Sequence, residues 1–246
     1  MDKFVRKIKR HKYHAESEDD QSPPNKKTCR STGSIFTKCY TLENLKLDYG
    51  ILYSKHQADC LYEKLESSLV YNEGALAQVK LFGKTIDIPR KQVAFGCPGL
   101  SYTFSGNTIP ARSWENFPAL KSIKGDIEAS LNNLYSFNFV LINRYESGND
   151  YMGEHQDNEK DLIKDMPIAS LSLGQQRDFV FRHKDTRGKH KSRKDIQPLT
   201  ISLQHGSLLV MHHPTNIFWY HSLPKRKKLV FPRINLTFRI MASSSK

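Results

Sequence analysis

The chain has 246 residues and a formal net charge of +13, with 38 Lys and Arg against 25 Asp and Glu. Its length suits one domain of ordinary size with a tail. No stretch approaches the ~20 apolar residues of a transmembrane helix, and the amino-terminal segment is charged rather than signal-like. We therefore expect a soluble protein that is neither secreted nor bound to a membrane. The basic excess favours a polyanionic partner.

The charged residues are segregated along the chain. Seven basic residues fall between Arg182 and Lys194, and Lys225 to Lys228 form a second basic run. Acidic residues gather instead between positions 146 and 165. Solvated surface charge is the alternative for either basic run taken alone, but it explains an even mixture better than this segregation.

The first part of the chain predicts an arm followed by a helix. Residues 1–45 are rich in Lys, Ser, Asp and Glu and have little apolar periodicity, so they predict a disordered basic arm. Over residues 56–71, Leu61, Leu65 and Leu69 recur every four residues. This spacing predicts an amphipathic helix with one buried stripe.

Most of the remaining chain predicts strands, with one further helix at 117–134. Short runs rich in β-branched and aromatic residues lie at 76–90, 137–145, 167–174, 177–184, 197–203, 207–213, 216–222 and 233–241. So many short strands in one domain predict a mixed α+β fold, mainly β, over residues 46–246. The expected architecture is a sandwich or jelly roll with flanking helices.

One H-x-D triplet, at 155–157, offers a metal site together with a later histidine. On an extended segment the side chains of His155 and Asp157 emerge on the same face. With His221 they supply two imidazoles and one carboxylate, the facial triad that holds Fe(II) and leaves positions for a cosubstrate and O2. A second H-x-D triplet, at 183–185, lies among cations that oppose metal binding, whereas the first lies among acids. We therefore favour the first.

The segment 233–239 alternates strictly between polar and apolar residues. On a strand, Arg233 and Arg239 therefore share one face with Asn235 and Thr237. Two arginines on one face suit a small dicarboxylate that planar, bidentate donors clamp at both ends. A surface strand is the alternative. We favour ligand binding because His221 of the triad precedes Arg233 by only twelve residues.

The ordered set Asn143-x-Tyr145, His155-x-Asp157, His221 and Arg233-x-Asn235-x-Thr237-x-Arg239 resembles the AlkB family of Fe(II)- and 2-oxoglutarate-dependent dioxygenases. The resemblance covers about residues 50–240 and implies a double-stranded β-helix, or jelly roll. It also implies that His155, Asp157 and His221 bind Fe(II). For 2-oxoglutarate, which reacts with O2 as cosubstrate, it implies binding by Asn143, Tyr145, Arg233, Asn235, Thr237 and Arg239.

By the same resemblance, the substrate is double-stranded DNA that carries 1-methyladenine or 3-methylcytosine. Demethylation would release formaldehyde, succinate and CO2, and we expect a monomer in the nucleus. These lesions lie on the Watson-Crick edge, so the base must be flipped out of the duplex. A nucleotide-recognition lid is expected at about residues 76–112. The residues expected to contact DNA are Phe82, Gly83, Arg90, Tyr102, Phe104, Ser105, Asn158, Glu159, Arg182, Lys184, Arg187, Gly188 and Lys189.

Within this set, Phe82 would be the wedge that fills the gap in the duplex, and Phe104 would stack on the flipped base. Packing onto the core is the alternative for both aromatics. The cations between Arg182 and Lys189 would hold phosphates without reading sequence.

Two features depart from the family pattern. Asn158 stands where the family commonly has a second acid after the metal-binding aspartate, although Glu159 follows it. Because the methylated bases are cations, an amide at this position puts lesion preference in doubt. At the amino terminus, Lys3 to Lys7 resembles a short motif that binds the replication sliding clamp, but Arg6 interrupts its second aliphatic position.

Three other functions remain open from the sequence. An RNA demethylase of the same family would differ only in its substrate. A non-catalytic nucleic-acid-binding module would not bind 2-oxoglutarate and would leave the paired arginines unexplained. A zinc hydrolase could use the same two histidines and aspartate but has no need of those arginines.

Overall fold

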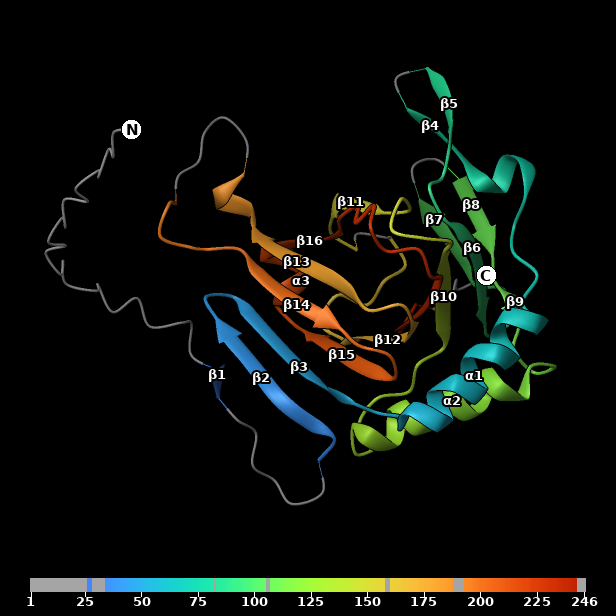
Figure 1. Cartoon of the computed structure of the whole chain (residues 1–246), viewed down its shortest axis with the longest axis horizontal. Coiled ribbons are helices and arrows are strands. Elements are labelled where there is room, and N and C mark those ends of the chain that lie inside the picture. The colour runs from blue at the N-terminus through green and yellow to red at the C-terminus, as the bar shows by residue number, and fades with distance from the viewer. Residues whose placement is uncertain are drawn as a thin grey trace, which may run out of the picture.

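A nine-stranded sheet forms the larger layer of the computed structural model (Figure 1). The structure describes residues 26–27, 34–81, 83–104, 107–157, 160–187 and 193–242. The strand order is β1-β2-β3-β15-β12-β17-β10-β6-β9, antiparallel throughout except between β6 and β9. The strands span Lys26–Lys27 (β1), Phe36–Leu42 (β2), Leu45–Ile51 (β3), Ser207–His212 (β15), Ile168–Gly174 (β12), Arg233–Arg239 (β17), Phe139–Tyr145 (β10), Lys91–Gly96 (β6) and Arg112–Ser113 (β9).

A four-stranded sheet forms the second layer, in the order β11-β16-β13-β14. Its strands are Met152–His155 (β11), Trp219–Leu223 (β16), Arg177–His183 (β13) and Leu199–Leu203 (β14). Apolar side chains from both sheets, such as Leu141 and Leu209 of the larger and Phe181 and Trp219 of the smaller, pack into one core cluster. Two sheets that enclose a common core confirm the predicted jelly roll.

Two helices cover the outer face of the larger sheet (Figure 1). Helix α1 (Lys55–Ser68) begins at a capping box in which Ser54 and Gln57 exchange hydrogen bonds. Helix α2 (Pro118–Ser130) begins with proline in its first turn, where a missing N–H costs nothing. Leu65 of α1 and Ile123 of α2 are fully buried, in a cluster with Leu171 and Leu236 of the sheet.

Short elements complete the fold. They are the single-turn helices Gly74–Ala77 (η1), Lys184–Thr186 (η2) and Thr215–Phe218 (α3). None of the helices in the described part of the chain has the length and apolar character needed to cross a bilayer.

Two hairpins lie at one end of the sheets, within the predicted lid. Strands β4 (Gln78–Leu81) and β5 (Lys84–Asp87) form the first, which extends away from the rest of the molecule (Figure 1). Gly83 at its turn has φ +76°, a conformation that favours glycine. Strands β7 (Ser101–Phe104) and β8 (Asn107–Pro110) form the second hairpin. Asn107 donates to the backbone carbonyl of Ala75, which ties the second hairpin to the foot of the first.

The structure corrects the predicted end of the amino-terminal arm. We expected residues 1–45 to be disordered, but Phe36–Leu42 is a strand paired with β3. Phe36 and Tyr40 are buried, and the register shifts between Phe36 and Lys38. The extra residue of this bulge breaks the period-2 alternation by which a strand is detected in sequence. Residues 1–25 lie outside the described part.

Candidate active site

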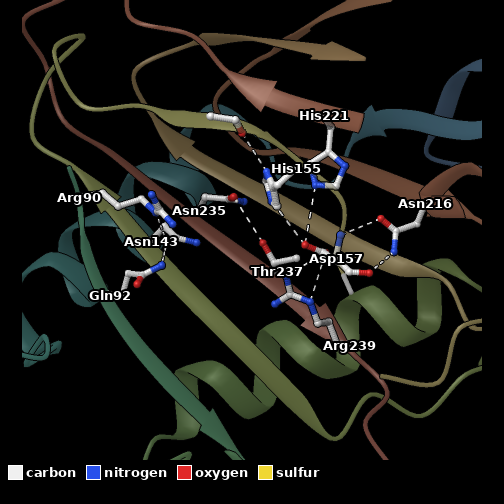
Figure 2. Close-up of polar contacts among 11 residues, drawn as sticks. Arg90, Gln92, Asn143, His155, Asp157, Asn216, His221, Asn235, Thr237 and Arg239 are labelled. Atoms are coloured by element: carbon white, nitrogen blue, oxygen red, sulfur yellow. Dashed lines mark hydrogen bonds and ion pairs between the residues drawn. The ribbon is translucent and has the colours of Figure 1, made fainter. Parts of the chain in front are cut away.

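Two neighbouring strands of the smaller sheet carry the histidines of the predicted triad. His155 at the end of β11 pairs in register with His221 of β16, and Asp157 follows two residues after His155. Nε2 of His155 lies 3.5 Å from Oδ1 of Asp157, and Nε2 of His221 lies 3.8 Å from the same oxygen. One ligand atom from each residue falls within 4.8 Å of the others. The three side chains converge in Figure 2.

The surroundings of the triad leave its ligand atoms without protons, as metal binding requires. Nδ1 of His155 lies 3.0 Å from the Gly153 carbonyl, so it must donate there and leave Nε2 as the ligand. Burial and the nearby His155 lower the pKa of His221 to about 4, which keeps its imidazole neutral. Burial alone would raise the pKa of Asp157, but Arg239 and the two histidines outweigh it and hold that pKa well below its usual range.

The second H-x-D triplet does not build such a cluster. His183 is buried, its Nδ1 accepts from the Asp185 backbone N–H, and its ring stacks against Phe218. In the described part of the chain, only His155, Asp157 and His221 bring together three groups able to hold a metal ion. The electrostatic reason for favouring the first triplet agrees with this geometry.

The two predicted arginines occupy opposite ends of β17, at the centre of the larger sheet. Arg239 forms a buried ion pair with Asp157, with Nη2 2.8 Å from Oδ2 (Figure 2). Arg233 is 1% exposed, donates from Nη2 to Ser172, and has no hydrogen-bond partner for Nε or Nη1 among the described residues. Its guanidinium carbon lies 5.3 Å from the ring centroid of Tyr145. Burial lowers the pKa of Arg233 to about 10.

The buried position of β17 excludes the surface-strand alternative, because six of its seven residues are buried. It pairs with β10 on one side and β12 on the other. Asn143 and Asn235 are register partners on β10 and β17, and Thr237 donates weakly to Asn235 at 3.5 Å. These three side chains therefore lie together between the two arginines.

A cavity joins the triad to these polar residues. Its lining includes the apolar side chains of Phe179, Phe181 and Met211 and the polar residues His155, Asp157, His221, Asn143, Asn235, Thr237 and Arg239. Tyr102 of the second hairpin also lines it, 4% exposed, and the Arg239 guanidinium lies 5.4 Å from its ring centroid. The lid and the metal-binding residues therefore share one cavity.

The donor set fits an iron and a dicarboxylate. Two imidazole nitrogens and one carboxylate oxygen suit Fe(II) in a facial triad. The unpartnered N–H groups of Arg233 suit a carboxylate, since a buried guanidinium without an acceptor is costly.

The cations expected to hold phosphates are already engaged with protein groups. Arg182 and Arg187 both pair with Glu154, at 3.0 and 2.8 Å, one with each carboxylate oxygen. The Arg187 guanidinium also lies 3.5 Å from the ring centroid of Tyr220, and Lys184 lies 4.1 Å from that of Phe218.

The second basic run shows the same behaviour. Within it, Arg226 pairs with Asp178 at 2.9 Å. Nζ of Lys225 lies 4.6 Å from the ring centroid of Tyr151. Both cations therefore contact side chains of the protein itself.

The structure places Arg90 in the interior, although the sequence led us to expect a DNA contact there. It is 9% exposed and donates from Nε to Asn143 at 2.9 Å. Several other expected contacts lie outside the described residues: Phe82, the side chain of Phe104, Ser105, Asn158, Glu159, Gly188, Lys189 and the Lys3 to Lys7 motif.

Sequence reasoning missed several residues that shape this site. Asn216 holds the backbone of Asp157, accepting from its N–H at 3.0 Å and donating to its carbonyl at 2.6 Å. Glu154 holds two arginines, and Ser172 accepts from Arg233. No spacing rule reveals such partners, because they act through contacts between distant parts of the chain. The position of Glu154 directly before a metal-binding histidine was the only available signal.

Comparison with known proteins agrees with this geometry. The family model of the 2OG-Fe(II) oxygenase superfamily matches residues 51–239. The chain is 51% identical over 204 residues to the DNA oxidative demethylase ALKBH2 of Bos taurus. The matched segment covers 83% of this chain and 72% of the bovine protein. The ALKBH2 of Homo sapiens is 50% identical over 197 residues, covering 80% and 74%.

A more distant relative belongs to the same group. The alpha-ketoglutarate-dependent dioxygenase alkB homolog 3 of Homo sapiens is 36% identical over 156 residues, which cover 63% of this chain and 52% of that protein. Together with the triad, these matches show that the chain is an Fe(II)- and 2-oxoglutarate-dependent dioxygenase of the AlkB family.

Proposed function

We propose that this protein is a DNA oxidative demethylase in which His155, Asp157 and His221 hold the iron. The observation that carries the proposal is the convergence of these three ligands on one cavity, which the lid residue Tyr102 also lines. The DNA substrate is supported by the ALKBH2 relatives at about half identity, which are named DNA oxidative demethylases.

In this proposal Arg233 and Tyr145 receive the carboxylate of 2-oxoglutarate that lies farther from the iron. Arg233 offers two nitrogens, Nε and Nη1, that have no partner among the described residues, and Tyr145 is fully buried beside it. Asn143, Asn235 and Thr237 orient the remainder of the cosubstrate along the cavity. Arg239 stays at the iron end, where its ion pair keeps Asp157 ionised.

When bound, iron, 2-oxoglutarate and O2 supply the oxidation of the N-methyl group, with succinate, CO2 and formaldehyde as products. The chain needs no nucleophile of its own for this reaction. Its contribution is to hold the reactants in place and to keep water out, since the apolar side chains of Phe179, Phe181 and Met211 also line the cavity.

Base flipping would bring the methylated base of a duplex into this cavity. Tyr102, which lines the cavity, would contact the flipped base, and Phe104 would stack on it. Phe82 would fill the gap in the duplex, because the hairpin next to it extends from the body of the protein (Figure 1). Arg182, Lys184 and Arg187 would exchange their present partners for phosphates.

The wider biological setting follows from this substrate. We propose that the protein repairs alkylated double-stranded DNA in the nucleus and that it acts as a monomer. Recruitment to the replication sliding clamp through Lys3 to Lys7 is part of the same proposal. Its support is the sequence motif alone.

The test is formaldehyde release from a DNA duplex that carries 1-methyladenine or 3-methylcytosine, with Fe(II), ascorbate and 2-oxoglutarate. We expect release that stops when 2-oxoglutarate is omitted. A matched RNA duplex measures the competing RNA demethylase function. Binding of DNA without any release would favour a non-catalytic binding module and overturn the proposal.

A further inference from the structure

Arg90 lies where the first hairpin joins the larger sheet, between the end of β5 and the start of β6. Figure 2 shows Arg90 and Gln92 pointing toward Asn143 of β10. Nε of Arg90 donates to Oδ1 of Asn143 at 2.9 Å, and both residues are buried. Nη1 of Arg90 reaches the backbone carbonyl of Tyr151 at 3.4 Å.

Gln92 joins the same network. Its amide nitrogen donates to Oδ1 of Asn143 at 2.8 Å. With the Gln92 amide turned over, its oxygen would instead lie 3.1 Å from Nη2 of Arg90. In that orientation Gln92 no longer donates to Asn143, whereas the hydrogen bond from Nε of Arg90 to Oδ1 of Asn143 is the same in both.

These contacts determine which side of the Asn143 amide faces the cavity. Because Arg90 can only donate, the Asn143 atom 2.9 Å from its Nε is the amide oxygen, whichever way the Gln92 amide is turned. The amide nitrogen, which carries two N–H donors, is left to face the cavity that Asn143 lines. A cationic donor on the oxygen also polarises the amide, which strengthens its N–H groups as donors.

We propose that Arg90 is a positioning residue for 2-oxoglutarate, which acts by fixing the Asn143 amide with its N–H groups toward an oxygen of the cosubstrate. This inference rests on the proposed role of Asn143 in cosubstrate binding. It changes the function expected for Arg90 from the sequence, where we predicted contact with DNA.

The surroundings of Arg90 favour this function over a phosphate contact. Its guanidinium is held inside the protein, whereas Lys84 and Lys91 on the flanking strands are exposed. The backbone N–H of Tyr151 also donates to the Pro89 carbonyl at 3.3 Å. The hairpin foot is thereby joined to the segment that leads into β11 and His155, as well as to the strand that carries Asn143.

The experiment measures two affinities for the wild type and for Arg90→Met. The first is the Kd for 2-oxoglutarate with Mn(II) in place of iron and without oxygen, so that no turnover occurs. The second is the Kd for an unmodified DNA duplex. Arg112→Met is the matched control, because Arg112 is an exposed arginine of the same region that bonds to Val70 and Asn72 instead.

We expect Arg90→Met to weaken 2-oxoglutarate binding about tenfold, which corresponds to ~1.4 kcal/mol. DNA binding should stay within about twofold of the wild type, and Arg112→Met should leave the 2-oxoglutarate affinity unchanged. In an Asn143→Ala background, Arg90→Met should have little further effect, because a residue that acts through Asn143 is coupled to it.

Arg90→Lys keeps one cationic donor and should recover part of the lost affinity. It also replaces Arg90→Met in every comparison if thermal unfolding shows that the methionine variant does not fold. Additive effects of Arg90→Met and Asn143→Ala, or a loss of DNA binding alone, would overturn the inference. Wild-type protein that failed to bind 2-oxoglutarate would overturn the proposed function as well, so the two failures are distinguishable.

Discussion

Arg233 in the interior of the jelly roll and the arginines around its mouth have opposite surroundings. Arg233 in the interior is almost completely buried, and its Nε and Nη1 atoms have no acceptor among the described residues. At the surface, Arg182 and Arg187 are partly exposed and share the carboxylate of Glu154, one oxygen each. Arg233 thus lacks acceptors that an anion could supply, whereas the two surface arginines already have an acceptor in Glu154.

This difference indicates how tightly each region depends on its ligand. A buried donor without a partner costs roughly 1–3 kcal/mol, and a ligand that supplies the acceptor recovers that cost. An exposed ion pair contributes only ~0–1 kcal/mol, so a phosphate can replace Glu154 with little net change. We therefore expect large effects from the interior and small ones from the surface.

The largest effect should come from the metal ligands. His221→Ala removes one of three ligands, so we expect loss of bound iron and of detectable formaldehyde release. Iron content and turnover are measured on the same preparation. Asp185→Asn in the other H-x-D triplet is the control and should retain both; a loss of iron there would contradict the assignment of the site.

Arg233→Met should separate binding from stability. It removes the donors for one carboxylate, so we expect a roughly 100-fold rise in the KM for 2-oxoglutarate, about 2.7 kcal/mol. In the ligand-free protein it also removes buried groups without acceptors, so the free energy of unfolding should rise by ~1–3 kcal/mol. Thermal unfolding without cosubstrate measures the second effect.

Arg177→Met is the control that gives this result its meaning. Arg177 is equally buried, but its Nη atoms donate to the backbone carbonyls of Ser147, Asp150 and Pro224. Its replacement leaves these carbonyls without donors and should lower the free energy of unfolding by about 2–4 kcal/mol. Destabilisation by both variants would show that Arg233 is a structural residue.

The same contrast explains how much of the molecule the sequence predicts. The site could be predicted from the sequence because its residues repeat at short, regular spacings: His155 with Asp157, and Arg233 with Arg239 on a strictly alternating strand. Such spacings follow from strand geometry and from the chemistry of the ligand. Both the jelly roll and the clustering of the triad agree with them.

Contacts between segments far apart in the sequence could not be predicted in this way. The bulged strand at 36–42 lost its alternation, and Arg90 gave no sign that its partner is Asn143, fifty-three residues away. A single arginine beside a predicted hairpin suggests a phosphate contact on charge alone. Only the folded arrangement shows that its side chain turns inward.

A smaller effect is expected from the hairpin wedge. Phe82→Ala should lower turnover of a methylated duplex about tenfold, because stacking on a base contributes ~1–3 kcal/mol. Turnover of the same lesion in a single strand should change little, since no gap has to be filled. Leu134→Ala, which truncates an exposed apolar residue next to helix α2, is the control. Equal losses on both substrates would exclude the wedge.

The smallest effect should come from the surface arginines. Arg187→Gln would remove one of the proposed phosphate contacts, so the slope of log Kd against log salt concentration for duplex DNA should fall by about 1. The Kd itself should rise only a few-fold at physiological salt, because Arg187 gives up its ion pair with Glu154 to bind DNA. Arg193→Gln is the control, since Arg193 is held by both Glu43 and Asp195 and should stay with them. If the two variants changed the slope equally, basic charge near the mouth would act as a diffuse field, and the positions of individual arginines would not matter.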